Sequence, residues 1–367
     1  MVQTAVSLHH PTDLAAWHGS VGAGSNPLRN LPNRIRSRRD PEPPELMLPP
    51  GSAGHADILI VIESPTASQV ASLVAPMRFL DPERVALLTT AGSRHRLQLD
   101  PSSAWVTITD PQDLSRALPG LRSVLTYGHY MRLGAIADIT ARKVGATSFV
   151  AQHGIITPLA PPLPEGSHLL AWSEADVRFW TSGRSDVGHH IVGSQLLHEA
   201  HQGAAGDGLL FPSETERDLG TPTGITYLGQ LHGSELPRRS MASAAVHFCR
   251  STDATYRPHP SEHDLVSRMQ HALWRRRGIR FDSSRLPLRD LHTEVVSVFS
   301  TGVLEAAAAG IPSWVNFPDP PKWLEELWQR YSMSRFGSAE PTRVEAPIDE
   351  PARTVAEIIA ANAEEPR

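Results

Sequence analysis

Two short segments in the second half of the sequence combine residue types that could bind a phosphate group. The first is RPHP at residues 257–260, in which each proline fixes its own backbone and biases the preceding residue toward extended geometry. His259 lies between these prolines, so its ring can be aimed at a phosphate oxygen, with Arg257 adding positive charge nearby. A histidine whose hydrogen bonds are satisfied within a loop is the alternative.

The second segment is STG at residues 300–302, between an apolar run of strand length and the small-residue run AAAAG. The first backbone N–H groups of a helix are unpaired and carry the positive end of its dipole. Gly302 would let a phosphate approach these groups, and the Ser300 and Thr301 hydroxyls would add donors. An ordinary helix cap by one hydroxyl explains the same residues. Glu305, one turn later, is a candidate for binding a ribose hydroxyl or for a solvent-facing carboxylate.

Strands and helices alternate along most of the sequence, and this order decides where the two segments lie. DILIVIE at residues 57–63 is a continuous apolar run, which is typical of a strand buried on both faces of a parallel sheet. Similar runs recur in both halves, separated by stretches with helical spacing. Ligands of such sheets bind beyond the carboxyl ends of the strands, which is where both segments lie. We therefore predict the α/β class, with two Rossmann-like domains facing a cleft.

Changes in composition along the sequence predict the domain boundaries. Residues 1–54 are rich in Pro, Gly, Ser and Arg and lack apolar periodicity, and their basic run from Arg34 to Arg39 suits a solvated tail or an acidic membrane surface. Residues 201–223 are polar and rich in Gly and Pro, as interdomain linkers are. The predicted units are a flexible N-terminal extension (1–54), an N-terminal Rossmann-like acceptor domain (55–200), a linker (201–223), a C-terminal Rossmann-like nucleotide-binding domain (224–340) and a C-terminal helix or tail (341–367) that can pack back on the first domain.

The bulk composition argues against several classes of protein. The 367 residues include 34 basic and 39 acidic side chains, so the net charge of -5 gives no reason to expect a nucleic-acid partner. One cysteine, Cys249, can form neither an intrachain disulfide nor a cysteine-rich zinc site. No signal peptide and no apolar stretch of about 18 residues is found. These features predict a cytoplasmic protein and leave contact with the inner face of the membrane open.

Other chemistries lack their sequence signatures. The first strand is followed by ESPTASQ, without the glycines of a dinucleotide-binding loop, and no P-loop is present. No HExxH motif or cysteine cluster supports the scattered histidines as metal ligands. His189 and His190 are adjacent in a predicted strand, so they point to opposite faces. We therefore predict no metal site and no cofactor, with an activated donor as a substrate.

The two segments together resemble a motif pair of known glycosyltransferases. Bacterial sialyltransferases, Kdo transferases and teichoic acid polymerases of the CDP-glycerol type share the two-Rossmann GT-B architecture. They carry an HP motif followed by an SS or ST motif in the nucleotide-binding half, and these motifs are similar to His259-Pro260 and Ser300-Thr301 here. The resemblance covers the layout of residues 55–320, but the matched motifs comprise only these four residues. It implies that these groups hold the phosphate of a CMP- or CDP-linked donor.

The same families use a histidine or an acidic residue of the N-terminal half as the catalytic base. The sequence HGIITP, which starts at His153, resembles the HG and TP of the teichoic acid polymerases. The resemblance implies that His153 is the base and that Gly154 lets the acceptor approach. The acidic D/E-D/E-G motif of sialyltransferases is not found, so Glu63 and His129 are alternatives, with Gly128 also on the acceptor side. A structural histidine at a strand end is the other interpretation of His153.

These observations predict transfer of a sugar or related unit from a cytidine-nucleotide-activated donor. The acceptor would be a cell-surface polysaccharide or teichoic-type polymer, glycan or lipid-linked, and no metal would be needed. One alternative is a two-lobed nucleotide-sugar or glycan binding protein without turnover. Another is a GT-B enzyme that uses a UDP- or GDP-sugar.

Overall fold

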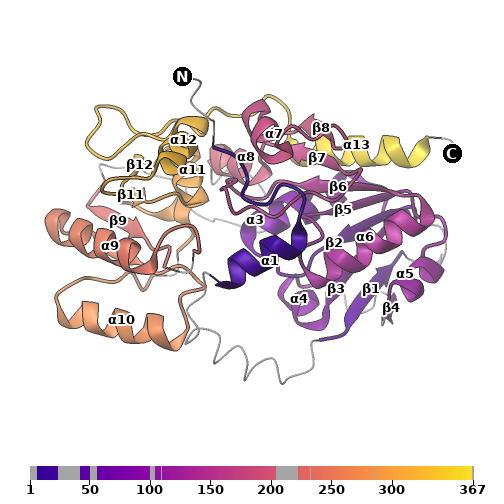
Figure 1. Cartoon of the computed structure of the whole chain (residues 1–367), viewed down its shortest axis with the longest axis horizontal. Coiled ribbons are helices and arrows are strands. Elements are labelled where there is room, and N and C mark those ends of the chain that lie inside the picture. The colour runs from indigo at the N-terminus through magenta and orange to yellow at the C-terminus, as the bar shows by residue number, and fades with distance from the viewer. Residues whose placement is uncertain are drawn as a thin grey trace.

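The computed structural model describes residues 6–23, 42–49, 56–99, 104–108, 110–203, 222–231, 233–284 and 286–365. These residues form two α/β units that lie side by side, each built on its own sheet (Figure 1). The first sheet, in spatial order, consists of β4 (Ala104–Thr107), β1 (Pro44–Leu48), β3 (Val85–Thr90), β2 (Ile58–Val61), β5 (Ser123–Thr126), β6 (Thr147–Ala151), β7 (His168–Ala171) and β8 (Gly188–Ile191). The second sheet, in spatial order, consists of β10 (Thr255–Arg257), β9 (Ile225–Leu228), β11 (Glu294–Ser297) and β12 (Ser313–Val315). The predicted α/β class with two sheet-based units is therefore confirmed.

Both faces of the central strands of the first sheet are buried, whereas the edge strands β4 and β8 are more exposed. Ile58 and Ile60 of β2 belong to one buried apolar cluster, whereas Leu59 and Val61 belong to another. Side chains alternate between the faces of a strand, so an unbroken apolar run means that helices cover both sides. The sheet is parallel from β3 to β8, and only its β1 and β4 edge is antiparallel.

The helices follow the alternation that the sequence predicts. Those before β9 are α1 (Leu14–Ala23), α3 (Ala67–Gln69), α4 (Ala91–Arg96), α5 (Pro111–Ala117), α6 (Arg132–Val144), α7 (Glu174–Thr181) and α8 (Gln195–Gln202), with a π-turn η1 (Val70–Val74) and a 3-10 segment η2 (Ala75–Phe79). Those of the second unit are α9 (Arg238–Thr252), α10 (Leu265–Arg276), η4 (Leu288–Asp290), α11 (Thr301–Ala308) and α12 (Lys322–Arg330). Within the described ranges, no helix is long and apolar enough to span a lipid bilayer.

The N-terminal region differs from the flexible extension predicted for residues 1–54. Its described parts form α1 and β1, and β1 pairs with both β3 and β4. Leu46 and Leu48 are buried in the sheet core, whereas their neighbours Glu45 and Met47 are partly exposed. This alternation is the period of a strand, but the run is short and follows a proline-rich stretch that hides it. The basic run from Arg34 to Arg39 lies outside the described residues.

The last helix, α13 (Pro351–Glu364), belongs to the first unit although it follows the second in the sequence. Val355, Ile359 and Ala363 are buried in the same cluster as Ile58 of β2. The Ser123 hydroxyl of β5 also donates to the Ile359 carbonyl over 2.8 Å. The chain therefore crosses from the second unit back to the first. Of the predicted linker, residues 204–221 lie outside the described residues.

Tyr331 and Arg330, at the end of α12, tie the second unit to the first. The Tyr331 hydroxyl donates to the buried Asp176 carboxylate over 2.5 Å and accepts from the Ile156 N–H over 2.7 Å. Arg330 lies 3.6 Å from the same carboxylate and stacks on Phe179 at 3.8 Å from the ring centre. Burial raises the pKa of Asp176, although Tyr331 and other hydrogen-bond donors oppose the shift. A buried carboxylate of α7 thus links the first unit to the end of α12 in the second.

Candidate active site

A cavity of about 1010 Å³ lies between the two units. Its second-unit wall follows the carboxyl ends of β9, β10 and β11, because parallel strands end at the same edge of a sheet. Its first-unit wall contains Thr66, Ala67, Ser68, Ile155, Thr157 and Leu196. The residues predicted to bind the donor all line the second-unit wall, namely Arg257, His259, Pro260, Ser300, Thr301, Gly302 and Glu305. The fold therefore brings together two segments that are about 40 residues apart in the sequence.

The turn after β10 fixes the tautomer of His259. The Ser261 N–H donates to Nδ1 of His259 over 3.1 Å, and the Glu262 N–H donates to the His259 carbonyl over 2.8 Å. Because Nδ1 accepts, the proton of the neutral ring is on Nε2. Burial lowers the pKa of His259, and the charge of Glu262 offsets this only in part. The ring is therefore a neutral hydrogen-bond donor on the cavity wall at neutral pH.

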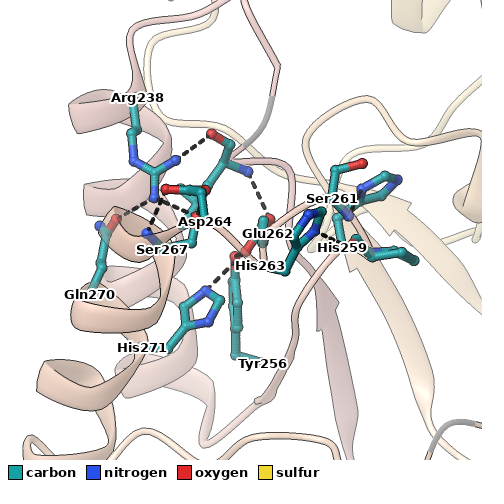
Figure 2. Close-up of polar contacts among 12 residues, drawn as sticks. Arg238, Tyr256, His259, Ser261, Glu262, His263, Asp264, Ser267, Gln270 and His271 are labelled. Atoms are coloured by element: carbon teal, nitrogen blue, oxygen red, sulfur yellow. Dashed lines mark hydrogen bonds and ion pairs between the residues drawn. The ribbon is translucent and has the colours of Figure 1, made fainter. Parts of the chain in front are cut away.

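Glu262, which no sequence motif singles out, is buried beside this turn (Figure 2). Its Oε2 accepts from the Tyr256 hydroxyl over 2.8 Å and lies 3.0 Å from Nε2 of His271. Its Oε1 accepts from the Leu231 N–H over 2.9 Å. Burial raises the pKa of Glu262, but the hydrogen bonds from His271 and Tyr256 outweigh it, so the net pKa is lowered. One buried carboxylate thus joins β10, α10 and the loop after β9 beneath His259.

The three residues at the start of α11 have three different contacts. Ser300 is the helix cap, and its hydroxyl accepts from the Gly302 N–H over 3.1 Å. The Thr301 hydroxyl accepts from the Ile155 N–H of the first unit over 3.2 Å. A Cβ on Gly302 would lie 2.7 Å from a methyl of Leu288 and 2.9 Å from a methyl of Leu228, so a larger residue there would require these side chains to shift. The cap interpretation holds for Ser300, yet both hydroxyls line the cavity and keep a proton that can be donated to a ligand.

Charged groups at one end of the cavity partly neutralise one another. Arg257 lies 3.2 Å from the Asp282 carboxylate and also donates to the Leu286 carbonyl. Burial raises the pKa of Glu305 to about 7, although the charges of Arg289 and Arg257 lower it in part. A carboxyl group of this kind is about half protonated at neutral pH, so it can donate or accept a hydrogen bond. Arg257 therefore contributes less free charge than its position in the sequence suggests.

Two further side chains of the cavity wall come from the end of β9 and the loop after it. Oε1 of Gln230 accepts from the Phe299 N–H over 2.9 Å and lies 2.9 Å from the Ser297 hydroxyl. These contacts fix the amide, because a backbone N–H can only donate. Glu235 accepts from the Thr157 hydroxyl of the first unit over 3.2 Å and from the Ser234 N–H over 2.9 Å. Glu235 is a carboxylate on the main cavity, and its only sequence signal is its place after a strand.

His153, the first candidate for the base, lies outside this cavity. It lines a separate space of about 20 Å³ together with residues of α8 and α13. Its Nδ1 is buried without a hydrogen-bond partner among the described residues. Burial lowers the pKa of His153 to about 4, with the Ala151 carbonyl opposing the shift. Gly154 lies nearer the main cavity, since a Cβ there would lie 3.3 Å from the Thr301 hydroxyl.

The alternatives Glu63 and His129 also lie off the main cavity. Glu63 accepts from the Leu133 N–H over 2.8 Å and so caps α6. Burial lowers the pKa of His129, whose nearby charges include Asp138 of α6. Gly128 has a left-handed backbone with φ 121°. A Cβ on Gly134 would lie 2.0 Å from the carbonyl oxygen of Gly128, so the two backbones are in close contact. These residues build the packing of α6 against the sheet.

Potential metal ligands do not gather in the described ranges. No group of three or more His, Cys, Asp or Glu side chains there is arranged to hold a metal ion. His190 lies 3.4 Å from His168 between ring nitrogens, while its neighbour His189 is exposed. This pair lies on β7 and β8, away from the cavity between the units.

Comparisons with known proteins give only remote likenesses. No protein-family model matches the sequence, and no curated protein does. A UDP-GlcNAc 2-epimerase from Methanocaldococcus jannaschii matches with a TM-score of 0.47 and 9% identity, over 83% of this chain and 99% of its own. An Anabaena protein solved with UDP and glucose matches with a TM-score of 0.42 and 13% identity, over 84% of this chain and 98% of its own. A glycosyltransferase from Rickettsia africae matches with a TM-score of 0.39 and 10% identity, over 84% of this chain and 93% of its own. At these scores the likeness is too remote to assign a function, which has to be inferred from the cavity.

Proposed function

We propose that the protein is a GT-B-type glycosyltransferase that uses a nucleotide-activated donor. The observation that carries the proposal is the convergence of His259, Ser300 and Thr301 on one cavity between two α/β units. These residues follow different strands, so their meeting is a property of the fold rather than of one local motif. A helix start with two hydroxyls and a neutral histidine donor is suited to a phosphate group.

The second-unit wall would hold the donor. The Nε2–H of His259 and the hydroxyls of Ser300 and Thr301 would donate to the phosphate oxygens, and the start of α11 would add its dipole. These groups stabilise the negative charge that grows as the nucleotide leaves, a role that a metal fills in other transferases. Glu305, one turn further along α11, would bond a ribose hydroxyl.

Glu235 takes the role of base in this proposal, in place of His153. It is a carboxylate on the cavity wall, and its hydrogen bond to Thr157 places it where the two units meet. In the transfer step the acceptor oxygen attacks the anomeric carbon of the donor, and its proton goes to Glu235. The bond between that carbon and the phosphate oxygen breaks, and the nucleotide leaves with the electron pair.

The cytidine nucleotide and the acceptor belong to the same proposal. The motif pair His259-Pro260 and Ser300-Thr301 favours a CMP- or CDP-linked donor. The first-unit wall offers the hydroxyls of Thr66, Ser68 and Thr157, which suit a glycan acceptor rich in hydroxyl groups. A UDP- or GDP-linked donor, or binding without turnover, is the competing outcome of the test below.

Nucleotide-dependent thermal shifts test the donor site. CMP and CDP are expected to raise the melting temperature in the presence of a chelator, because a ligand of the folded state stabilises it. His259→Ala should abolish the shift, whereas His292→Ala, which replaces an exposed histidine of the same unit, should leave it intact. Hydrolysis of a CMP- or CDP-linked donor would then separate an enzyme from a binding protein. A shift with UDP or GDP alone would overturn the cytidine assignment, and no shift with any nucleotide would overturn the proposed function.

A further inference from the structure

The outer face of α10 carries a row of exposed apolar side chains. Leu265, Met269 and Leu273 are 60%, 66% and 45% exposed. They are four residues apart, so they form one row along the helix. The opposite face is buried through Ser267, His271 and Trp274 of the same helix. Figure 1 shows α10 at the outer side of the second unit, away from the first sheet.

This row leads into a basic groove. The next residue four positions on is Arg277, which lines an open groove of about 590 Å³ between α9 and α10. Arg250 and Ser243 of α9 line the same groove. Within the described parts of the chain, neither Arg250 nor Arg277 forms an ion pair, and neither does Arg268 on the exposed face of α10. Cations and apolar side chains therefore lie together on one surface, and these cations have no ion-pair partner among the described residues.

We propose that this surface docks on an anionic lipid bilayer. Leu265, Met269 and Leu273 would enter the headgroup boundary, and Arg250 and Arg277 would bind lipid phosphates. An apolar row beside a basic groove favours a bilayer, because a bilayer offers hydrocarbon and negative charge within the depth of one headgroup layer. A nucleic acid offers the charge alone and leaves the apolar row in water. The proposal goes beyond the proposed function and does not depend on it.

Vesicle sedimentation with the full chain tests the proposal. We expect binding to vesicles of equimolar phosphatidylcholine and phosphatidylglycerol, little binding to phosphatidylcholine alone, and weaker binding at high salt. Met269→Ser and Leu273→Ser should each weaken binding roughly tenfold. Arg250→Gln and Arg277→Gln should each weaken it about fivefold. All four side chains are at the surface, so the fold should survive these changes.

Ile139→Ser is the matched control, because Ile139 is 48% exposed on α6 of the first unit. It should bind the anionic vesicles as the unchanged protein does. The proposal would be overturned if none of the four substitutions on α9 and α10 weakened binding to anionic vesicles. It would also be overturned if the unchanged protein did not bind anionic vesicles. Sedimentation equilibrium without lipid tests whether a second copy of the chain covers this face instead. A dimer that Met269→Ser dissociates would mean that a second copy of the chain covers this face, which also overturns the bilayer assignment.

Discussion

The carboxyl group of Glu305 gives the stability of this protein a dependence on pH that one substitution should remove. Burial raises the pKa of Glu305 to about 7 in the folded state, even though Arg289 and Arg257 oppose the shift. In the unfolded chain the same group titrates near its ordinary value of 4.5. The folded state therefore binds this proton more tightly. Its contribution to stability is complete below the unfolded pKa and is lost as the pH rises through the folded pKa.

The size of the effect follows from the shift. Moving a pKa from 4.5 to about 7 corresponds to roughly 3 kcal/mol, at about 1.4 kcal/mol for each pKa unit. Glu305→Gln keeps the shape of the side chain and carries no charge at any pH. At about pH 4 the variant should be as stable as the unchanged protein, and at about pH 8 it should be more stable by roughly 3 kcal/mol.

Urea unfolding followed by tryptophan fluorescence measures this difference. The useful quantity is the gap between the two proteins at each pH, because other groups change the stability of both alike. Glu340→Gln is the control, since Glu340 is paired with Arg343 at the surface with its side chain 69% exposed. Its stability should follow that of the unchanged protein. If the Glu305→Gln curve also ran parallel to the unchanged protein between about pH 4 and pH 8, the carboxyl would not be desolvated and the reasoning would fail.

Two other substitutions test the contacts around the cavity. Tyr331→Phe should lower the free energy of unfolding by about 1–3 kcal/mol, because buried Asp176 loses a hydrogen-bond donor; an unchanged urea midpoint would show that another group replaces it. Glu262→Gln should cost a similar amount and flatten the acid side of the stability profile. The lowered pKa of Glu262 means that its stabilisation is present above the unfolded pKa and lost as the pH falls through the folded one. A thermal unfolding series below about pH 5 that kept its slope in this variant would contradict the role assigned to the carboxylate.

That the proposed donor-binding residues share one cavity could be predicted from the sequence, because the signals that place them are local. The apolar run that starts at Val295 ends at Phe299, and a run of helix-forming residues follows Ser300, so the hydroxyls fall between a strand and a helix. The same holds for His259, which is the second residue after β10. Parallel strands then bring these ends to one edge of the sheet, whatever the chain does between them.

The enclosure of His153 and the positions of Glu235 and Glu262 could not be predicted, because they depend on contacts between residues far apart in the sequence. His153 also follows a strand, yet it lines a small separate space with residues of α8 and α13, and α13 begins only at Pro351. Glu262 binds the Leu231 N–H and the His271 ring, and no short sequence motif relates these residues to it. Glu235 needs the approach of the first unit before it becomes part of a cavity wall. Such positions are set by the packing of whole units.

Because α13 packs on the first unit, that unit cannot complete its core until the last part of the chain has been synthesised. Ile58, Ile60 and Leu125 leave the ribosome early, but Val355 and Ile359, which cover the same cluster, emerge only after the entire second unit. Until then the part of this cluster that α13 covers is exposed apolar surface, although η1 and η2 cover the rest. We therefore expect the nascent N-terminal half to be a chaperone client. The two units should mature together, as the final helix closes over a sheet that was translated first.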